Sequence, residues 1–311
     1  MREWTVDLGS LRLANGALLH NVQQRVSIYG ERRDDNVVLV PHALTGSSRV
    51  AEWWPGIVGD NALFDPREWC IIGINALGSC YGSTRAPDVT VADMVNAARR
   101  ALDEVGVERI RFVVGGSLGG MQALQWALDD ARVESAIVVG AHSHHSALGV
   151  ALNAVQREAI AIDPARGLRL ARKIAMLTYK SEDLFNRRHD RRPDRNDPSR
   201  FDIEGYLELA AERFAGRMDP QTYATLTQAM DRFDVRDRAV PDADVTFVGI
   251  SSDWLFRPQD VRAAAKGFGA RYIEMRSDHG HDAFLAESTE LADLLRPVVA
   301  AQPQPGSARH A

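Results

Sequence analysis

Cysteine is nearly absent from this chain, long apolar runs are missing, and neither sign of charge dominates. Two cysteines occur among 311 residues, too few for a disulfide framework, so we expect Cys70 and Cys80 to be free thiols in a reducing cytoplasm. No run of about eighteen apolar residues occurs, which argues against a membrane-spanning helix. The net charge of −5 is weak and provides no general attraction for nucleic acid. We therefore expect a cytoplasmic protein without membrane or nucleic-acid partners.

Alternating strand and helix patterns fill most of the remaining sequence. Hydrophobic residues make up 45% of the chain and charged residues 25%, enough to bury one large core. Segments with strand character alternate with helical ones, which predicts a mostly parallel sheet with helices on both faces. The expected strands are 36–41, 70–75, 111–115, 134–140, 244–250 and 271–276, with hairpin strands in 17–30.

The middle of the chain breaks this alternation. Between residues 146 and 239 only helical patterns occur, at 147–162, 168–178, 203–217 and 220–233. We therefore predict a core domain formed by 1–145 and 240–300, a helical lid of 146–239 inserted into it, and a disordered tail of 301–311. A lid of this kind excludes water from the space beneath it.

The most informative stretch is Val113–Gly120, which reads VVGGSLGG. An apolar strand runs into a serine flanked by glycines, Gly115-x-Ser117-x-Gly119, and a helix pattern follows. This arrangement is typical of a nucleophile elbow, where a sharp strand-to-helix turn presents the serine hydroxyl above a sheet. For the motif alone, the alternatives are a glycine-rich turn that cradles a phosphate and one that only allows a helix to pack closely.

Two further residues follow predicted strands in the order that a catalytic triad requires. Asp253 comes directly after the strand 244–250, and His281 lies in the glycine loop after 271–276. Each alone could be a turn or surface residue. The order Ser117, Asp253, His281 is that of the α/β-hydrolase triad. In such a triad the histidine takes the serine proton, while the aspartate orients the imidazole.

An acyl-transfer site also needs donors for the oxyanion. The backbone N–H of Leu118, next to the nucleophile, is one expected donor, and that of Leu44, in the loop after strand 36–41, is the other. We expect His42 to brace this loop. His142, His144 and His145 also cluster, but no carboxylate or cysteine accompanies them at ligand spacing, so we predict no metal site.

Five blocks together resemble the homoserine O-acetyltransferases. They are His42–Gly46, Asn75–Thr84, Gly115–Leu124, Ser252–Phe256 and Gly280–Leu285, within a similarity that extends from about residue 11 to 295. The resemblance implies an α/β-hydrolase fold and acyl transfer rather than hydrolysis. It further implies that acetyl-CoA acylates the serine, and that the hydroxyl of homoserine then attacks the acyl-enzyme with the histidine as base.

The resemblance also implies an acceptor site. The aspartate after the catalytic histidine, here Asp282, would bind the acceptor's amino group, although a helix N-cap role is an alternative. A tyrosine of the lid, here Tyr206, would line the pocket. The family usually has arginine where this chain has Lys180, and this residue would bind the acceptor carboxylate without arginine's bidentate geometry.

Three functions remain open from the sequence. The first is a CoA-dependent O-acyltransferase with no bound cofactor, using acetyl-CoA or succinyl-CoA as co-substrate and L-homoserine, or a relative such as L-serine, as acceptor. The second is a carboxylesterase with the same triad, and the third is an inactive relative. The basic run 187–195 is expected to be a solvated loop, with a contact to CoA phosphates as the alternative. By analogy with the family we expect a homodimer.

Overall fold

One eight-stranded sheet forms the centre of the molecule. The computed structural model describes residues 1–33 and 35–302, and the sheet has the order β1-β2-β4-β3-β5-β6-β7-β8. Its strands are β1 (Arg2–Arg12), β2 (Leu18–Tyr29), β3 (Val37–Leu39), β4 (Cys70–Ile74), β5 (Ile110–Gly116), β6 (Val133–Val139), β7 (Asp244–Ile250) and β8 (Arg271–Met275). From β4 through β8 all neighbouring strands are parallel, so their carboxyl ends share one edge.

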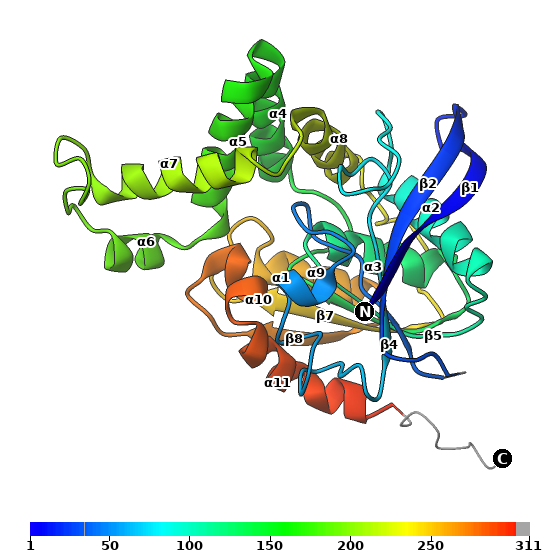
Figure 1. Cartoon of the computed structure of the whole chain (residues 1–311). Coiled ribbons are helices and arrows are strands. Elements are labelled where there is room, and N and C mark those ends of the chain that lie inside the picture. Colours follow the sequence, from blue (N-terminus) through cyan, green and yellow to red (C-terminus); the bar gives the residue numbers. More distant parts are fainter. Residues whose placement is uncertain (34, 303–311) are drawn as a thin grey trace.

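The first two strands form a long antiparallel hairpin at the edge of the sheet. β1 pairs with β2, and β2 pairs with β4, both antiparallel. Strand β1 was not expected from the sequence; the predicted hairpin region, 17–30, is β2 alone. The hairpin projects beyond the body of the sheet, as Figure 1 shows in blue.

Helices cover both faces of the sheet, as the alternating pattern predicted. Val91 of α2, Met121 of α3 and Val261 of α9 belong to the core on one face. Val50 of α1 and Leu291 of α11 belong to the core on the other. The helices of this layer structure are α1 (Val50–Trp53), α2 (Val91–Glu104), α3 (Leu118–Asp129), α9 (Pro258–Gly267), α10 (Ala283–Ala286) and α11 (Ser288–Ala300).

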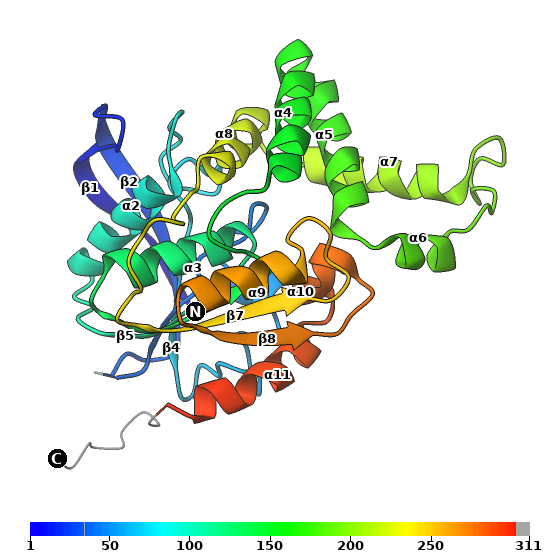
Figure 2. The same ribbon diagram turned by 180° about the vertical axis from the view of Figure 1, so that it is seen from behind.

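Five helices are inserted between β6 and β7. They are α4 (Ala147–Ile162), α5 (Pro164–Tyr179), α6 (Glu182–Arg188), α7 (Asp202–Ala215) and α8 (Pro220–Asp231). In Figures 1 and 2 they stand outside the sheet layers, with α4 and α5 side by side and α6 and α7 extending as an arm. We call residues 147–231 the helical insertion.

Three smaller findings complete the fold. Cys70 and Cys80 are free thiols, as predicted. None of the helices in the described ranges has the length and apolar character needed to cross a bilayer. Most of the predicted disordered tail, residues 303–311, lies outside the described residues.

Candidate active site

Ser117 sits at the junction of β5 and α3 in a strained backbone conformation. Its φ of 56° and ψ of −124° are unusual for a residue other than glycine. The two flanking glycines make the turn possible. A Cβ on Gly115 would lie 2.0 Å from the carbonyl oxygen of Gly119, and a Cβ on Gly119 would lie 2.4 Å from that of Pro41. The Gly-x-Ser-x-Gly pattern is therefore a steric requirement of this turn, as expected for a nucleophile elbow.

The structure brings Asp253 and His281 together. His281 Nδ1 lies 2.6 Å from Asp253 Oδ2, and both side chains are almost fully buried. The other carboxylate oxygen of Asp253 accepts backbone N–H bonds from Leu255 and Phe256, each 2.9 Å long. With both oxygens occupied, the carboxylate is fixed in the orientation that holds the imidazole.

The second ring nitrogen of His281 is not engaged by another protein group. Nε2 is buried and has no hydrogen-bond partner, and Ser117 and His281 line the same cavity. Burial lowers the pKa of His281, but the charge of Asp253 and its hydrogen bond outweigh this effect, so the pKa lies above 6.5. Phe256 stacks on the ring at 5.1 Å. An oriented imidazole with a free Nε2 is what a general base needs.

The loop after β3 carries the expected oxyanion donor. His42 braces it as predicted: Nε2 accepts a 2.9 Å bond from the N–H of Ala76, and Nδ1 lies 2.7 Å from the carbonyl of Ala43. Burial lowers the pKa of His42 to about 4, so the ring is neutral. Over 1–33 and 35–302, the N–H groups of Leu44 and Leu118 donate to no other backbone group, and both residues are buried.

A cavity of about 680 Å³ connects these groups with solvent. Besides Ser117 and His281 it is lined by four arginines that the sequence analysis did not single out. Arg25 and Arg49 pair with Glu3, whereas Arg172 of α5 and Arg217, just past α7, come from the helical insertion. The Nε of Arg172 is buried without a partner, and its guanidinium lies 4.8 Å from the ring of Phe214. Arg217 donates to the carbonyl of Thr45 at 2.9 Å and to the Tyr81 hydroxyl at 3.1 Å.

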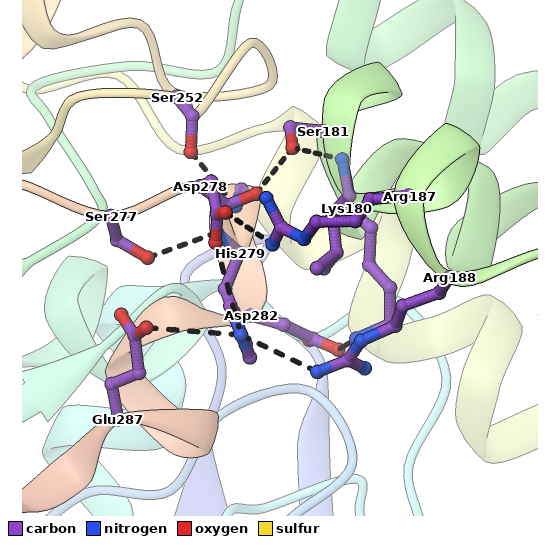
Figure 3. Close-up of polar contacts among 12 residues, drawn as sticks. Lys180, Ser181, Arg187, Arg188, Ser252, Ser277, Asp278, His279, Asp282 and Glu287 are labelled. Carbon is purple, nitrogen blue, oxygen red and sulfur yellow. Dashed lines mark hydrogen bonds and ion pairs between the residues drawn. The ribbon is translucent and has the colours of Figure 1, made fainter.

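The three predicted acceptor residues lie in different places. Asp282 lines the cavity, and its Oδ2 accepts a 2.9 Å bond from Lys180 Nζ, as Figure 3 shows. Lys180 is not among the residues that line the cavity. Tyr206 is not either; its ring lies 4.8 Å from that of His189, within the insertion. Of the three, only Asp282 therefore lines the cavity that Ser117 and His281 share.

The loop that carries His281 is held by the helical insertion. Ser181 donates to the carbonyl of Asp278, and Arg187 pairs with the Asp278 carboxylate (Figure 3). Arg188 lies 3.5 Å from His279 Nε2. The prediction of a solvated loop from Arg187 onward is thus wrong for its first two residues, because α6 extends through them and contacts the core.

One group of potential metal ligands lies in and beside the loop that carries His281. In the described part of the chain, only Asp278, His279 and Glu287 form a group close enough to share an ion. Arg187 and Arg188 already contact this group, and their positive charges oppose a cation. The three clustered histidines do not form such a group: His145 instead lies 2.9 Å from Asp231.

Comparison with known proteins places this geometry in a family. Residues 36–288 match the model of the alpha/beta hydrolase fold. A homoserine O-acetyltransferase of Deinococcus radiodurans is 39% identical, over 91% of this chain and 88% of that protein. A homoserine O-succinyltransferase of Neisseria gonorrhoeae is 35% identical, over 89% of each.

A solved structure agrees with these sequence relatives. The homoserine O-acetyltransferase of Staphylococcus aureus matches with a TM-score of 0.84 and 26% identity, over 96% of this chain and 95% of that one. The shared fold extends through the helical insertion, because so little of either chain is left uncovered. The chain belongs to the homoserine O-acetyltransferase family, a family of acyltransferases with the α/β-hydrolase fold.

Proposed function

We propose that this protein transfers an acetyl group from acetyl-CoA to the side-chain hydroxyl of L-homoserine through an acyl-Ser117 intermediate. The observation that carries the proposal is the Asp253–His281 pair, because the Nε2 of His281 has no hydrogen-bond partner and His281 lines the same cavity as Ser117. The names of the sequence relatives support the choice of donor and acceptor.

In the first half-reaction Ser117 becomes acylated. His281 Nε2 takes the Ser117 proton as Oγ bonds to the thioester carbon, and the N–H groups of Leu44 and Leu118 stabilise the negative oxygen. The carbon–sulfur bond then breaks, and His281 returns the proton to the departing thiolate. No metal or bound cofactor is needed for these steps.

In the second half-reaction the acceptor replaces the thiol. The homoserine hydroxyl gives its proton to His281 as its oxygen attacks the ester carbon, and Ser117 leaves with that proton. Asp282 lies beside His281 and has one carboxylate oxygen not engaged by Lys180. We assign it to the acceptor's ammonium group.

The acceptor carboxylate needs a cation in the same cavity. Arg172 meets this requirement, because it lines the cavity and its buried Nε lacks a partner. Lys180, the residue predicted from the sequence, points to Asp282. We therefore propose Arg172 as the carboxylate ligand and Lys180 as the residue that orients Asp282.

Thiol release tests the proposed function. The purified protein should release thiol from acetyl-CoA only when L-homoserine is present, and faster than with L-serine. Ser117→Ala should abolish this release and the acyl-protein adduct detected by mass spectrometry. Acceptor-independent release with ester turnover would identify a hydrolase, and no release from any donor would favour an inactive relative.

We further propose that the protein is a cytoplasmic homodimer paired through the helical insertion. Leu148, Val155 and Ile162 are exposed on α4 at seven-residue intervals, and Leu170 and Leu177 are exposed on α5. A spacing of seven places residues on one helix face. Exposed apolar faces of this kind are typical of protein interfaces, and the two free cysteines suit a reducing compartment.

A further inference from the structure

Two cavities meet at the nucleophile. The outer one, of about 680 Å³, is open to solvent, whereas a second, of about 20 Å³, lies deeper. Leu44, Ser117 and Tyr179 line both of them. His281 and Asp282 line only the outer one. We call the smaller cavity the inner compartment.

The proton transfers carried out by His281 determine on which side of Ser117 each part of the substrate must lie. His281 must protonate the departing thiolate and later deprotonate the attacking hydroxyl, so both must approach Ser117 from the side where His281 lies. That side is the outer cavity. In the tetrahedral intermediate the acyl substituent points away from the leaving group. The space left for it beside Ser117 and the Leu44 donor is the inner compartment.

The inner compartment is too small for a long acyl group. A volume of about 20 Å³ holds roughly one water-sized group, which is about the size of a methyl. Apolar side chains close it, namely Leu152 of α4, Ala175 of α5, Met230 of α8 and Leu255. A succinyl group would add two methylenes and a carboxylate to the methyl position.

The wall also lacks a partner for a carboxylate. The described residues that line the compartment include no lysine or arginine. Two of its polar side chains bond to neighbouring protein groups: Asn153 to Asp231, and Thr178 to the carbonyl of Ala175. The Nε2 of His145 has no hydrogen-bond partner, but it abuts Gly149, where an added Cβ would lie 2.2 Å from it. An ionised carboxylate placed here would be buried without a counter-charge, which is strongly unfavourable.

We infer that the inner compartment is the acyl-binding subsite and that its walls, Met230 above all, restrict the donor to acetyl-CoA. The inference rests on the proposed function and deepens it, because it selects between acetyl and succinyl donors by the volume and charge of this chain's own residues. Met230 is buried at the end of α8, so shortening it should lengthen the compartment without altering the triad.

A donor series tests the inference. Initial rates of L-homoserine-dependent thiol release are measured with acetyl-, propionyl-, butyryl- and succinyl-CoA, for the natural protein, Met230→Ala and Met176→Ala. Met176 is the matched control, because it is a methionine of the insertion with similar burial and lines neither cavity. Thermal unfolding shows that each variant is folded.

The expected outcomes separate this inference from the proposed function. The natural protein should use butyryl- and succinyl-CoA at least about tenfold less efficiently than acetyl-CoA. Met230→Ala should raise the butyryl-to-acetyl ratio of kcat/KM by about tenfold or more, and Met176→Ala should leave it unchanged. Equal use of acetyl- and succinyl-CoA, or the same ratio in both variants, would overturn the inference while acyl transfer stands. Failure of every donor would overturn the proposed function itself.

Discussion

Arg172 and Asp282 are the two charged side chains of the outer cavity that we propose bind the charged groups of the acceptor amino acid. In the proposed complex Arg172 would bind the acceptor's carboxylate and Asp282 its ammonium group. Asp282 already has Lys180 as a neighbour, whereas Arg172 has no carboxylate partner among the ion pairs of the described residues. We therefore expect the loss of Arg172 to weaken binding of the acceptor more than the loss of Asp282 does.

The first prediction concerns this arginine. Arg172→Met should raise the KM for L-homoserine by about 10- to 100-fold, because a charge-assisted contact to the substrate is lost, with a much smaller change in the KM for acetyl-CoA. Arg169→Met is the matched control, since Arg169 lies on the same helix but pairs with Glu212. Steady-state kinetics with each substrate varied in turn provides the measurement. Equal effects on both KM values would argue against a carboxylate role.

A second prediction concerns pH. His281 must be neutral to take the serine proton, and Asp253 holds its pKa above 6.5. The kcat/KM for acetyl-CoA should therefore rise with pH through a midpoint above 6.5. Asp253→Asn removes the raising charge and leaves the lowering effect of burial, so the midpoint should move down while kcat falls by about three to four orders of magnitude. An unchanged midpoint would contradict this assignment.

The residues of the candidate triad could be located from the sequence, but Arg172, the proposed ligand of the acceptor carboxylate, could not. Ser117, Asp253 and His281 each follow a strand, so the pattern of strands locates them at one edge of the sheet. Arg172 lies within an amphipathic helix and is indistinguishable there from a solvated arginine. Only the position of α5 over the sheet, which no local pattern encodes, turns its side chain into the cavity.

At the scale of elements, the junction of α7 and α8 contacts the oxyanion loop. Arg217 donates to the carbonyl of Thr45, the residue after the Leu44 donor, and its guanidinium lies 5.4 Å from the ring of Phe214. The insertion thus contacts the loop of the proposed oxyanion donor Leu44, just as α6 contacts the loop that carries His281. Both loops therefore depend on the position of the insertion.

The third prediction follows from this contact. Arg217→Gln should lower kcat by about tenfold or more with acetyl-CoA and also lower the acylation rate with p-nitrophenyl acetate, since a misplaced oxyanion donor affects any acyl donor. Arg217→Lys should restore part of the rate, and Arg213→Gln, at an exposed site near the end of α7, should have no effect. A change confined to the KM for acetyl-CoA would instead show that Arg217 binds CoA.

Fully buried strands were predicted best and amphipathic edge elements worst. The limits of β7 agree with the prediction because six of its seven residues are buried and apolar or small. Strand β1 escaped prediction because its exposed charged residues alternate irregularly with apolar ones. Helix α6 is short and highly charged, and Leu184 is its one buried residue, so it lacks the apolar periodicity that reveals a helix, although Ser181 caps it and its terminal charges suit the helix dipole.

At the scale of the whole molecule, we expect the exposed apolar residues of the insertion to be buried in an interface between two copies of the protein. The fourth prediction is that the protein elutes as a dimer and that Val155→Asp shifts it toward monomer, because a carboxylate would have to be desolvated at the interface. Val240→Asp is the matched control, at an exposed valine outside the insertion. Light scattering coupled to gel filtration measures the mass, and a monomer in the natural protein would refute the pairing.

The close approach between Gly280 and the insertion sets a rule for building chimeras. A Cβ at Gly280 would lie 2.7 Å from the carbonyl oxygen of Tyr179, so the backbone after α5 and the histidine loop fit each other without spare room. Helices grafted from a relative must keep the backbone path of residues 179–181 if the chimeric protein is to be active. Recombination points are therefore safer inside the outer arm, between α6 and α7, than at the hinge next to the catalytic loop.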